Sequence, residues 1–147
     1  MKYLLLAAAV LLSACDALPR DPAGTTQRIE RSKSFRIGFA SQDIEGNAPV
    51  RSLIAALEDE TKARAVIVSG GGEGLLSRLQ EGDLDIVIGR FKSDSPWQTE
   101  IAFGPALATE GRSSGPVELK AAMRNGENRW ITQVERASRI VIEGGAR

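Results

Sequence analysis

The residues of this chain that could do chemistry are few, and histidine is not among its 147 residues. Ser/His/Asp catalysis, Cys/His catalysis and the common zinc sites all need an imidazole, so the composition excludes them. Asp83 and Asp85 flank Leu84, and in a strand their carboxylates would point the same way, as an acid/base pair or a cation site requires. Because Asp83 follows Gly82, a place in a turn is the simpler interpretation. We therefore expect no enzyme activity, no cofactor and no metal.

A glycine-rich run, Ser-Gly-Gly-Gly-Glu-Gly at residues 69–74, is the second candidate. A phosphate-binding loop would end in Gly-Lys-Ser/Thr, but two leucines stand in those places, and no G-x-G-x-x-G register fits either. The backbone amides of Gly70, Gly71 and Gly72 could still bind an anion at the start of a helix, although Glu73 would compete with it. A flexible strand-to-helix turn is the simpler interpretation, and both stay open.

Two tryptophans and one arginine complete the candidates. Trp130 falls on the apolar face of a helix near the C-terminus, so we expect it in the core. Trp97 follows Pro96 in a polar loop at the strand ends, where its ring could stack on a ligand. Arg90 follows a predicted buried strand and could attract an anion.

The unit that positions these residues runs from Ser69 to Gly89. Its leucines share one face of a helix over residues 75–81, and Gly82 suits the left-handed end of that helix. Residues 84–88 form an apolar run typical of a parallel strand covered on both faces. Gly89 is then expected to close the strand, at the edge where open α/β sheets bind ligands.

The rest of the chain supplies the elements around this unit. We expect strands at 35–39, 65–68, 101–107 and 117–123, helices from Asn47 to Thr61 and from 130 to 141, and a loop at 110–116. Alternation at 117–123 predicts a strand with one solvent-facing side. The order strand, helix, strand, helix, strand predicts an α/β fold: one three-layer lobe with a mostly parallel sheet of four or five strands.

The N-terminal segment has the pattern of a signal sequence. Lys2 precedes a short apolar run that ends in Leu-Ser-Ala-Cys at residues 12–15. This ending resembles the lipobox of bacterial lipoproteins, in which the cysteine, here Cys15, becomes the acylated N-terminus. An ordinary secretory signal or a buried apolar helix is the alternative. We expect a signal peptide at 1–14, a tether at 15–34 with one helical turn around Thr25 to Arg31, a lobe at 35–143 and a tail at 144–147.

Charge and cysteine content limit the partners. The 19 basic and 19 acidic residues are interspersed and form no basic run, so the sequence shows no positively charged patch of the kind that binds nucleic acid. One cysteine allows no disulfide within the chain, and a chain of this size can bury a core without one.

Four segments follow one another in a recognisable order: residues 35–38 (Phe-Arg-Ile-Gly), 81–89 (Glu-Gly-Asp-Leu-Asp-Ile-Val-Ile-Gly), 93–97 (Ser-Asp-Ser-Pro-Trp) and 103–105 (Phe-Gly-Pro). This order resembles the first lobe of type II periplasmic solute-binding proteins, the family 3 substrate-binding components of ABC importers. Residues 121–128 and the helix after them resemble the strand and helix that return to that lobe.

The resemblance has two departures. The family's ligand lies between two lobes, but here only residues 108–116 separate the first-lobe pattern from the returning strand, so the second lobe is missing. Amino-acid-binding members grip their ligand with a threonine and an arginine. Asp94 and Trp97 stand at those positions here, so the amino-acid clamp is not carried over.

The resemblance implies a periplasmic lipoprotein that serves an ABC importer and binds a small polar solute, with a permease or a second copy as possible partners. The alternative is an interaction or scaffold lipoprotein that uses the surface left by the missing lobe. The expected localisation is the periplasmic face of a bacterial membrane, held by the lipid on Cys15. The candidate ligand-binding residues share the carboxyl ends of the predicted strands: Gln42, Asp43, Gly70, Gly71, Gly72, Arg90, Asp94 and Trp97.

Overall fold

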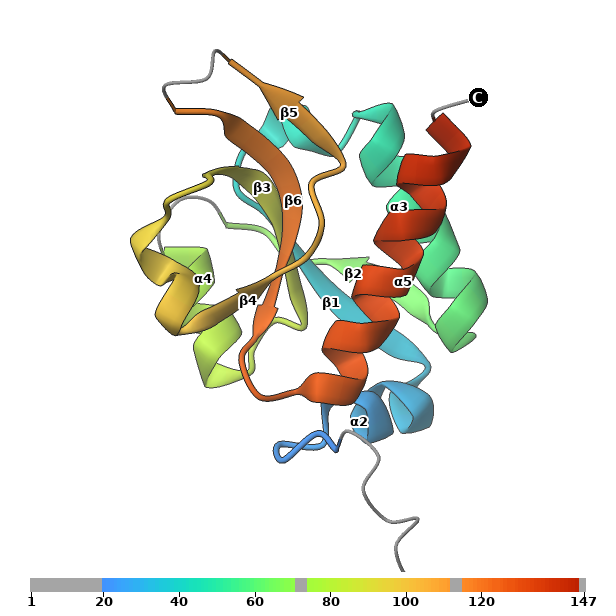
Figure 1. Ribbon diagram of the computed structural model, residues 1–147. Coiled ribbons are helices and arrows are strands. Elements are labelled where there is room, and N and C mark those ends of the chain that lie inside the picture. Colours follow the sequence, from blue (N-terminus) through green and yellow to red (C-terminus); the bar gives the residue numbers. More distant parts are fainter. Residues whose placement is uncertain (1–19, 71–73, 112–114, 146–147) are drawn as a thin grey trace, which may run out of the picture.

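A six-stranded sheet runs through the middle of the computed structural model, which describes residues 20–70, 74–111 and 115–145 (Figure 1). Along the sheet the strands lie in the order β2-β1-β3-β6-β4, and β5 also pairs with β6. Their bounds are β1 Ser34–Phe39, β2 Arg64–Ile67, β3 Ile86–Lys92, β4 Ile101–Phe103, β5 Ala108–Glu110 and β6 Val117–Arg124. β6 is antiparallel to each of its neighbours, so the other strands all run in one direction. The predicted α/β lobe is confirmed, with six strands where four or five are predicted and with antiparallel pairing wherever β6 takes part.

Helices cover both faces of the sheet. α3 (Ala48–Thr61) and α5 (Asn128–Gly145) lie side by side on one face, and α4 (Gly74–Glu81) lies on the other (Figure 1). α2 (Thr25–Ser32) sits at the end of the sheet where β1 begins, and the short 3₁₀ turns η2 (Gln42–Ile44) and η3 (Pro96–Thr99) follow β1 and β3. Among the described residues no helix is both long enough and apolar enough to cross a membrane.

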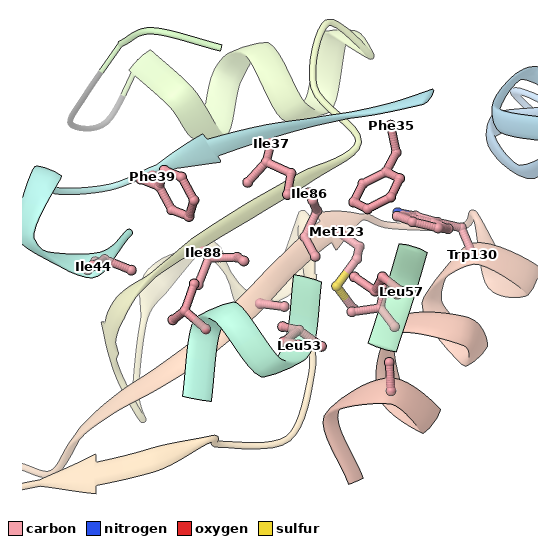
Figure 2. Packing of buried hydrophobic residues seen from close by; sticks show 14 of the residues in the cluster. Phe35, Ile37, Phe39, Ile44, Leu53, Leu57, Ile86, Ile88, Met123 and Trp130 are labelled. Atoms are coloured by element: carbon pink, nitrogen blue, oxygen red, sulfur yellow. The ribbon is translucent and has the colours of Figure 1, made fainter. Parts of the chain in front are cut away.

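The larger core lies between the sheet and the pair α3 and α5 (Figure 2). Alternate residues of β1 and β3 face the leucines of α3, as the period of two in a strand requires. Trp130 of α5 is fully buried, packs its ring 5.9 Å from that of Phe35 and donates from Nε1 to the Asp85 carbonyl at 2.7 Å. Its predicted place in the core is confirmed.

The smaller core lies under α4. The buried face of this helix is made of the leucines that the sequence places on one side, and it packs against the buried residues Leu84, Val87, Ile101 and Ala122. Gly82 ends the helix with φ 85°, a conformation that glycine adopts without strain. The helix and its cap therefore form as predicted, and the strand after them begins at Ile86, two residues later than predicted.

β3 extends beyond its predicted end. It continues through Gly89 to Lys92 because β6 offers pairing partners along that whole length. Gly89 serves close packing here and not chain termination: a Cβ at this position would lie 2.7 Å from the Cβ of Ala40 and 2.8 Å from the ring of Phe91. The sequence places Arg90 after the strand, whereas the structure places it inside the strand.

β6 has no solvent-facing side. The alternation from 117 to 124 predicts one, but Lys120 is 5% exposed and Ala122 is fully buried. β6 lies between β3 and the two short strands β4 and β5, so both of its edges are paired and both of its faces are covered. Lys120 keeps its charge inside the molecule by pairing with Glu118 at 2.6 Å, with Nζ 4.8 Å from the centre of the Phe103 ring.

Of the predicted strand at 101–107, only residues 101–103 form a strand, β4, and β5 follows at 108–110, beyond the predicted end. β4 pairs with residues 122–124 of β6, and β5 pairs with residues 117–119 along the same edge. β5 takes residues 108–110, the last of which the sequence places in a loop, and it leads by a short connection into β6. A hairpin therefore stands where the resemblance would insert a second lobe.

The predicted tether contains part of the lobe. Residues 25–32 form α2, whose Ile29 is 1% exposed and belongs to the larger core. Lys33, with φ 54°, turns the chain directly into β1. The described lobe therefore begins well before residue 35.

Candidate ligand-binding site

A pocket of about 330 Å³ opens at the carboxyl ends of β1 and β3, on the side of the sheet that α4 covers. Its volume lies at the lower end of the range for small-molecule sites, roughly 300–1,000 Å³. Most of its side chains are apolar, and its lining is Ala40, Leu76, Val87, Arg90, Phe91, Lys92, Ser95, Pro96 and Trp97. The pocket therefore lies where the sequence predicts a ligand, at the edge formed by the strand ends.

Trp97 is held in place by its own turn. The hydroxyl of Ser95 accepts a hydrogen bond from the Trp97 backbone N–H at 3.4 Å, and the Trp97 carbonyl accepts one from Glu100 at 3.0 Å. The ring is partly buried against the smaller core, beside Phe91 and Phe103, whose ring centres are 5.0 Å apart. An aromatic wall with one open side results, which is a surface on which a flat apolar group can stack.

Arg90 lies in a charge network at the rim. Its Nη1 donates to Asp43 at 2.7 Å, and its Nε lies 3.4 Å from Glu110 of β5. The Ser41 hydroxyl, 2.6 Å from Asp43, and then Arg90 lower the pKa of Asp43, and Asp43 in turn raises the pKa of Arg90. Because two carboxylates already balance this guanidinium, it has little net positive charge to offer an anion.

The remaining predicted site residues are dispersed. Gln42 and Asp94 are exposed and do not line the pocket. Gly70, at φ 147°, follows β2 and lies against α4, where a Cβ would be 3.3 Å from Arg78 and from Leu75. Gly71 and Gly72 lie outside the described residues. The structure thus brings Arg90 and Trp97 to one pocket and links Asp43 to it through Arg90.

Sequence reasoning missed the apolar part of the site. Leu76 and Phe91 line the pocket, and both were assigned to the core or left unassigned. The signal for Phe91 is its position four residues after Val87: once the strand continues past Gly89, alternation places both side chains on the face that α4 covers.

Asp83 and Asp85 do not form an acid/base pair. Asp83 is exposed in the turn, as its position after Gly82 suggests, and Asp85 is 3% exposed. Asp85 instead forms ion pairs with Arg28 of α2 and Arg36 of β1. Among the described residues no cluster of three or more acidic, cysteine or histidine side chains is arranged to hold a metal.

Comparison with known proteins supports the fold. No protein-family model matches this sequence, and no curated protein is significantly similar to it. Among solved structures, the arginine-bound domain 1 of TmArgBP superposes with a TM-score of 0.64 at 16% identity, over 77% of this chain and 97% of that one. An amino-acid ABC transporter substrate-binding protein from Streptococcus pneumoniae, bound to L-arginine, gives 0.69 at 8% identity, over 82% and 93%.

A third similar structure is the ancestral amino-acid-binding protein AncCDT-1, described as a precursor of cyclohexadienyl dehydratase, with a TM-score of 0.67, 13% identity and coverage of 82% of this chain and 94% of that one. At such identities the likeness concerns the fold. This chain is a single lobe of the α/β type found in periplasmic binding proteins, and the predicted resemblance to that type of lobe is confirmed at this level.

Proposed function

We propose that this chain is a solute-binding lobe that takes a small molecule in the pocket beside Trp97, and that it is held at the periplasmic face of a bacterial membrane by a lipid on Cys15. The observation that carries the proposal is the pocket itself, at the carboxyl ends of β1 and β3. Two arginine-bound proteins, one of them an ABC transporter substrate-binding protein, share the fold, which agrees with solute binding. The lipid anchor depends on the Leu-Ser-Ala-Cys pattern of the sequence.

The lining of the pocket indicates which part of a solute it would hold. Its walls are mainly apolar, and the one guanidinium at its rim is already paired with Asp43 and Glu110. A carboxylate placed against these apolar walls would lose water, which is costly, because the other cation of the lining, Lys92, is exposed to solvent. The part of the solute that enters is an uncharged apolar or aromatic group, and the polar part of the molecule stays at the opening.

A single lobe limits the affinity. Small-molecule sites usually bury most of the ligand surface, whereas a pocket on one lobe leaves one side of the ligand in water. We expect dissociation constants in the range of about 0.1–10 mM, which corresponds to roughly 3–5 kcal/mol. Detection therefore needs a method that responds to weak binding.

Ligand-observed ¹⁹F NMR meets this need. We expect 5-fluoroindole at millimolar concentration to show faster transverse relaxation with the protein, and L-arginine to compete poorly with it. Trp97→Ala should weaken binding about fivefold by removing the aromatic wall. Trp97→Phe should retain most of it, and Ile140→Ala, an exposed change on α5, should have no effect. Unchanged relaxation, or equal relaxation with Trp97→Ala, would overturn solute binding at this pocket.

A further inference from the structure

The N-terminal part of the described chain is fixed to the start of α5 by one carboxylate. Asp21 Oδ1 accepts hydrogen bonds from the backbone N–H groups of Arg129 and Trp130, at 2.7 and 3.2 Å. Asp21 Oδ2 accepts one from the N–H of Thr26 at 3.0 Å. These are N–H groups of first helical turns, which have no partner inside their own helices. Asp21 therefore caps two helices that are far apart in sequence.

A second carboxylate repeats the arrangement from the other side. Glu127, 2% exposed, precedes α5 and accepts hydrogen bonds from the N–H groups of Ala23 and Thr25, at 2.8 and 2.9 Å. Arg28 of α2 pairs with the buried Asp85. Because both ends of this segment are bonded to the lobe, Asp21 already belongs to the described folded body.

This position shortens the tether. The sequence alone gives a tether from residue 15 to 34, which could reach about 65–70 Å when extended. The segment from Cys15 to Asp21 can span about 20 Å at most. If Cys15 carries the lipid, as the proposed function holds, the α2 end of the lobe must lie near the bilayer surface.

The surface at this end is rich in arginine. A groove of about 750 Å³ between α2 and α5 is lined by Arg20, Arg129 and Arg136, and an adjoining groove of about 460 Å³ along α2 is lined by Arg28 and Arg31. Asp21 is the one acidic residue among the described residues that line the two grooves. Its carboxylate oxygens are already occupied by the backbone N–H groups of both helices.

These arginines can exchange partners. Arg129 pairs with Glu30 and Arg136 pairs with Glu60, each at 2.9 Å, and both arginine side chains are more than half exposed. Exposed pairs of this kind contribute little to stability because water screens them. A lipid phosphate offers a guanidinium two oxygens in matching geometry, and an anionic leaflet attracts basic residues near its surface.

We propose that this surface, formed by α2 and the first half of α5, binds the anionic phospholipid headgroups of the bilayer that holds the lipid on Cys15. β1 and β3 run away from α2, and the candidate pocket lies at their far ends (Figure 1). The docked lobe therefore directs the pocket away from the membrane, toward the solute.

The test uses the lipidated protein in vesicles with a nitroxide on a fraction of the headgroups. Because the sulfur of an acylated Cys15 is a thioether, a new cysteine is the only reactive thiol. A fluorophore on Asn128→Cys, at the α2 end, should be quenched at least twofold more in phosphatidylcholine with 30% phosphatidylglycerol than in phosphatidylcholine alone. High salt should remove this difference. A fluorophore on Glu45→Cys, beyond η2, should be quenched little in either.

Two arginine variants make the test specific. Arg31→Gln combined with Arg136→Gln should abolish the difference between the two kinds of vesicle. Arg139→Gln, an exposed arginine of α5 paired with Glu135 and outside both grooves, should leave it unchanged. Equal quenching in both kinds of vesicle, or equal loss in the two variants, would overturn docking.

Mass spectrometry of the same preparation separates this result from the proposed function. Acyl groups on Cys15 without a lipid-dependent difference in quenching would overturn docking alone and leave the anchor. If the protein carries no acyl groups, the proposed lipid anchor is overturned, and the proposed docking is overturned with it. Solute binding at the pocket is measured independently in both cases.

Discussion

The Asp85 carboxylate joins three elements through one buried charge. It pairs with Arg28 of α2 and Arg36 of β1, and it accepts the Arg36 backbone N–H at 2.7 Å, directly before β3. Asp85→Asn removes this negative charge, so the guanidinium groups of Arg28 and Arg36 lose their ion-pair partner. These arginine side chains are 38% and 31% exposed, so water offsets part of the loss. We expect a decrease of about 2 kcal/mol in the free energy of unfolding in urea. Asp83→Asn, in the exposed turn, is the matched control and should change it by less than about 0.5 kcal/mol.

Gly89 shows how one missing side chain shapes the pocket. A Cβ there would lie 2.7 Å from Ala40 and 2.8 Å from Phe91, and both residues line the pocket. Gly89→Ala should therefore lower the free energy of unfolding by about 1–3 kcal/mol and weaken binding of 5-fluoroindole, because the ring of Phe91 must move. Thermal unfolding and ¹⁹F relaxation measure the two effects. Gly46→Ala has open space around its Cβ, and an equal loss in that control would contradict the packing argument.

Sequence reasoning placed the candidate site at the strand ends, where a pocket lies, and treated Arg90 as an unpaired charge. Arg90 and Trp97 both reach the pocket because the carboxyl ends of the strands share one edge of the sheet. The partners of Arg90 could not be predicted, since Asp43 and Glu110 approach it from two other elements. A charge counted as free in the sequence is paired in the fold.

Among the elements, β6 could be predicted as a strand from its alternating residues, but the strands that pair with it could not. Alternation gave the strand, but it could not tell that β3 pairs on one edge and that β4 and β5 pair on the other. That arrangement is non-local, and it buries Lys120 with Glu118 as its charge partner. The boundary of β3 was misplaced for the same reason, because β6 supplies the partners that carry it past Gly89.

Local pattern predicts α2 only as one turn around Thr25 to Arg31 within a tether, and one substitution tests why a helix packed on the lobe forms there. It is a short polar helix with two buried residues, Thr26 and Ile29. The first N–H group of the helix, that of Thr25, is bonded by Glu127, about a hundred positions away in the chain. Glu127→Ala should cost about 2 kcal/mol of stability and should raise amide hydrogen exchange in α2 more than in α3. Glu143→Ala, on the exposed last turn of α5, should alter neither. Uniform acceleration across the lobe would mean that α2 does not open separately.

For the whole molecule, the order of elements was the most predictable property. Each crossover from strand to helix to strand could be read from periodicity and glycine placement, and this was enough to predict the lobe that the solved neighbours share. The predicted boundaries were less secure, because the ends of this lobe depend on hydrogen bonds between Asp21, Glu127 and distant backbone groups. Local sequence patterns therefore predict the central strands and helices, whereas long-range hydrogen bonds determine where the lobe begins and ends.

The charge of the whole chain predicts its response to pH. Without histidine, no side chain of ordinary pKa titrates between pH 5 and 8. The resolved shifts lie outside that window: Ser41 and Arg90 lower the pKa of Asp43, and Lys62 lowers that of Asp59. A lowered carboxyl pKa contributes stability above the unfolded value of 3.8 that is lost as pH falls through the folded value. We therefore expect melting temperatures, followed by circular dichroism, to stay within about 3 °C from pH 5.5 to 8 and to fall below about pH 4. A transition near pH 6.5 would contradict this and would require a strongly raised carboxyl pKa in the chain.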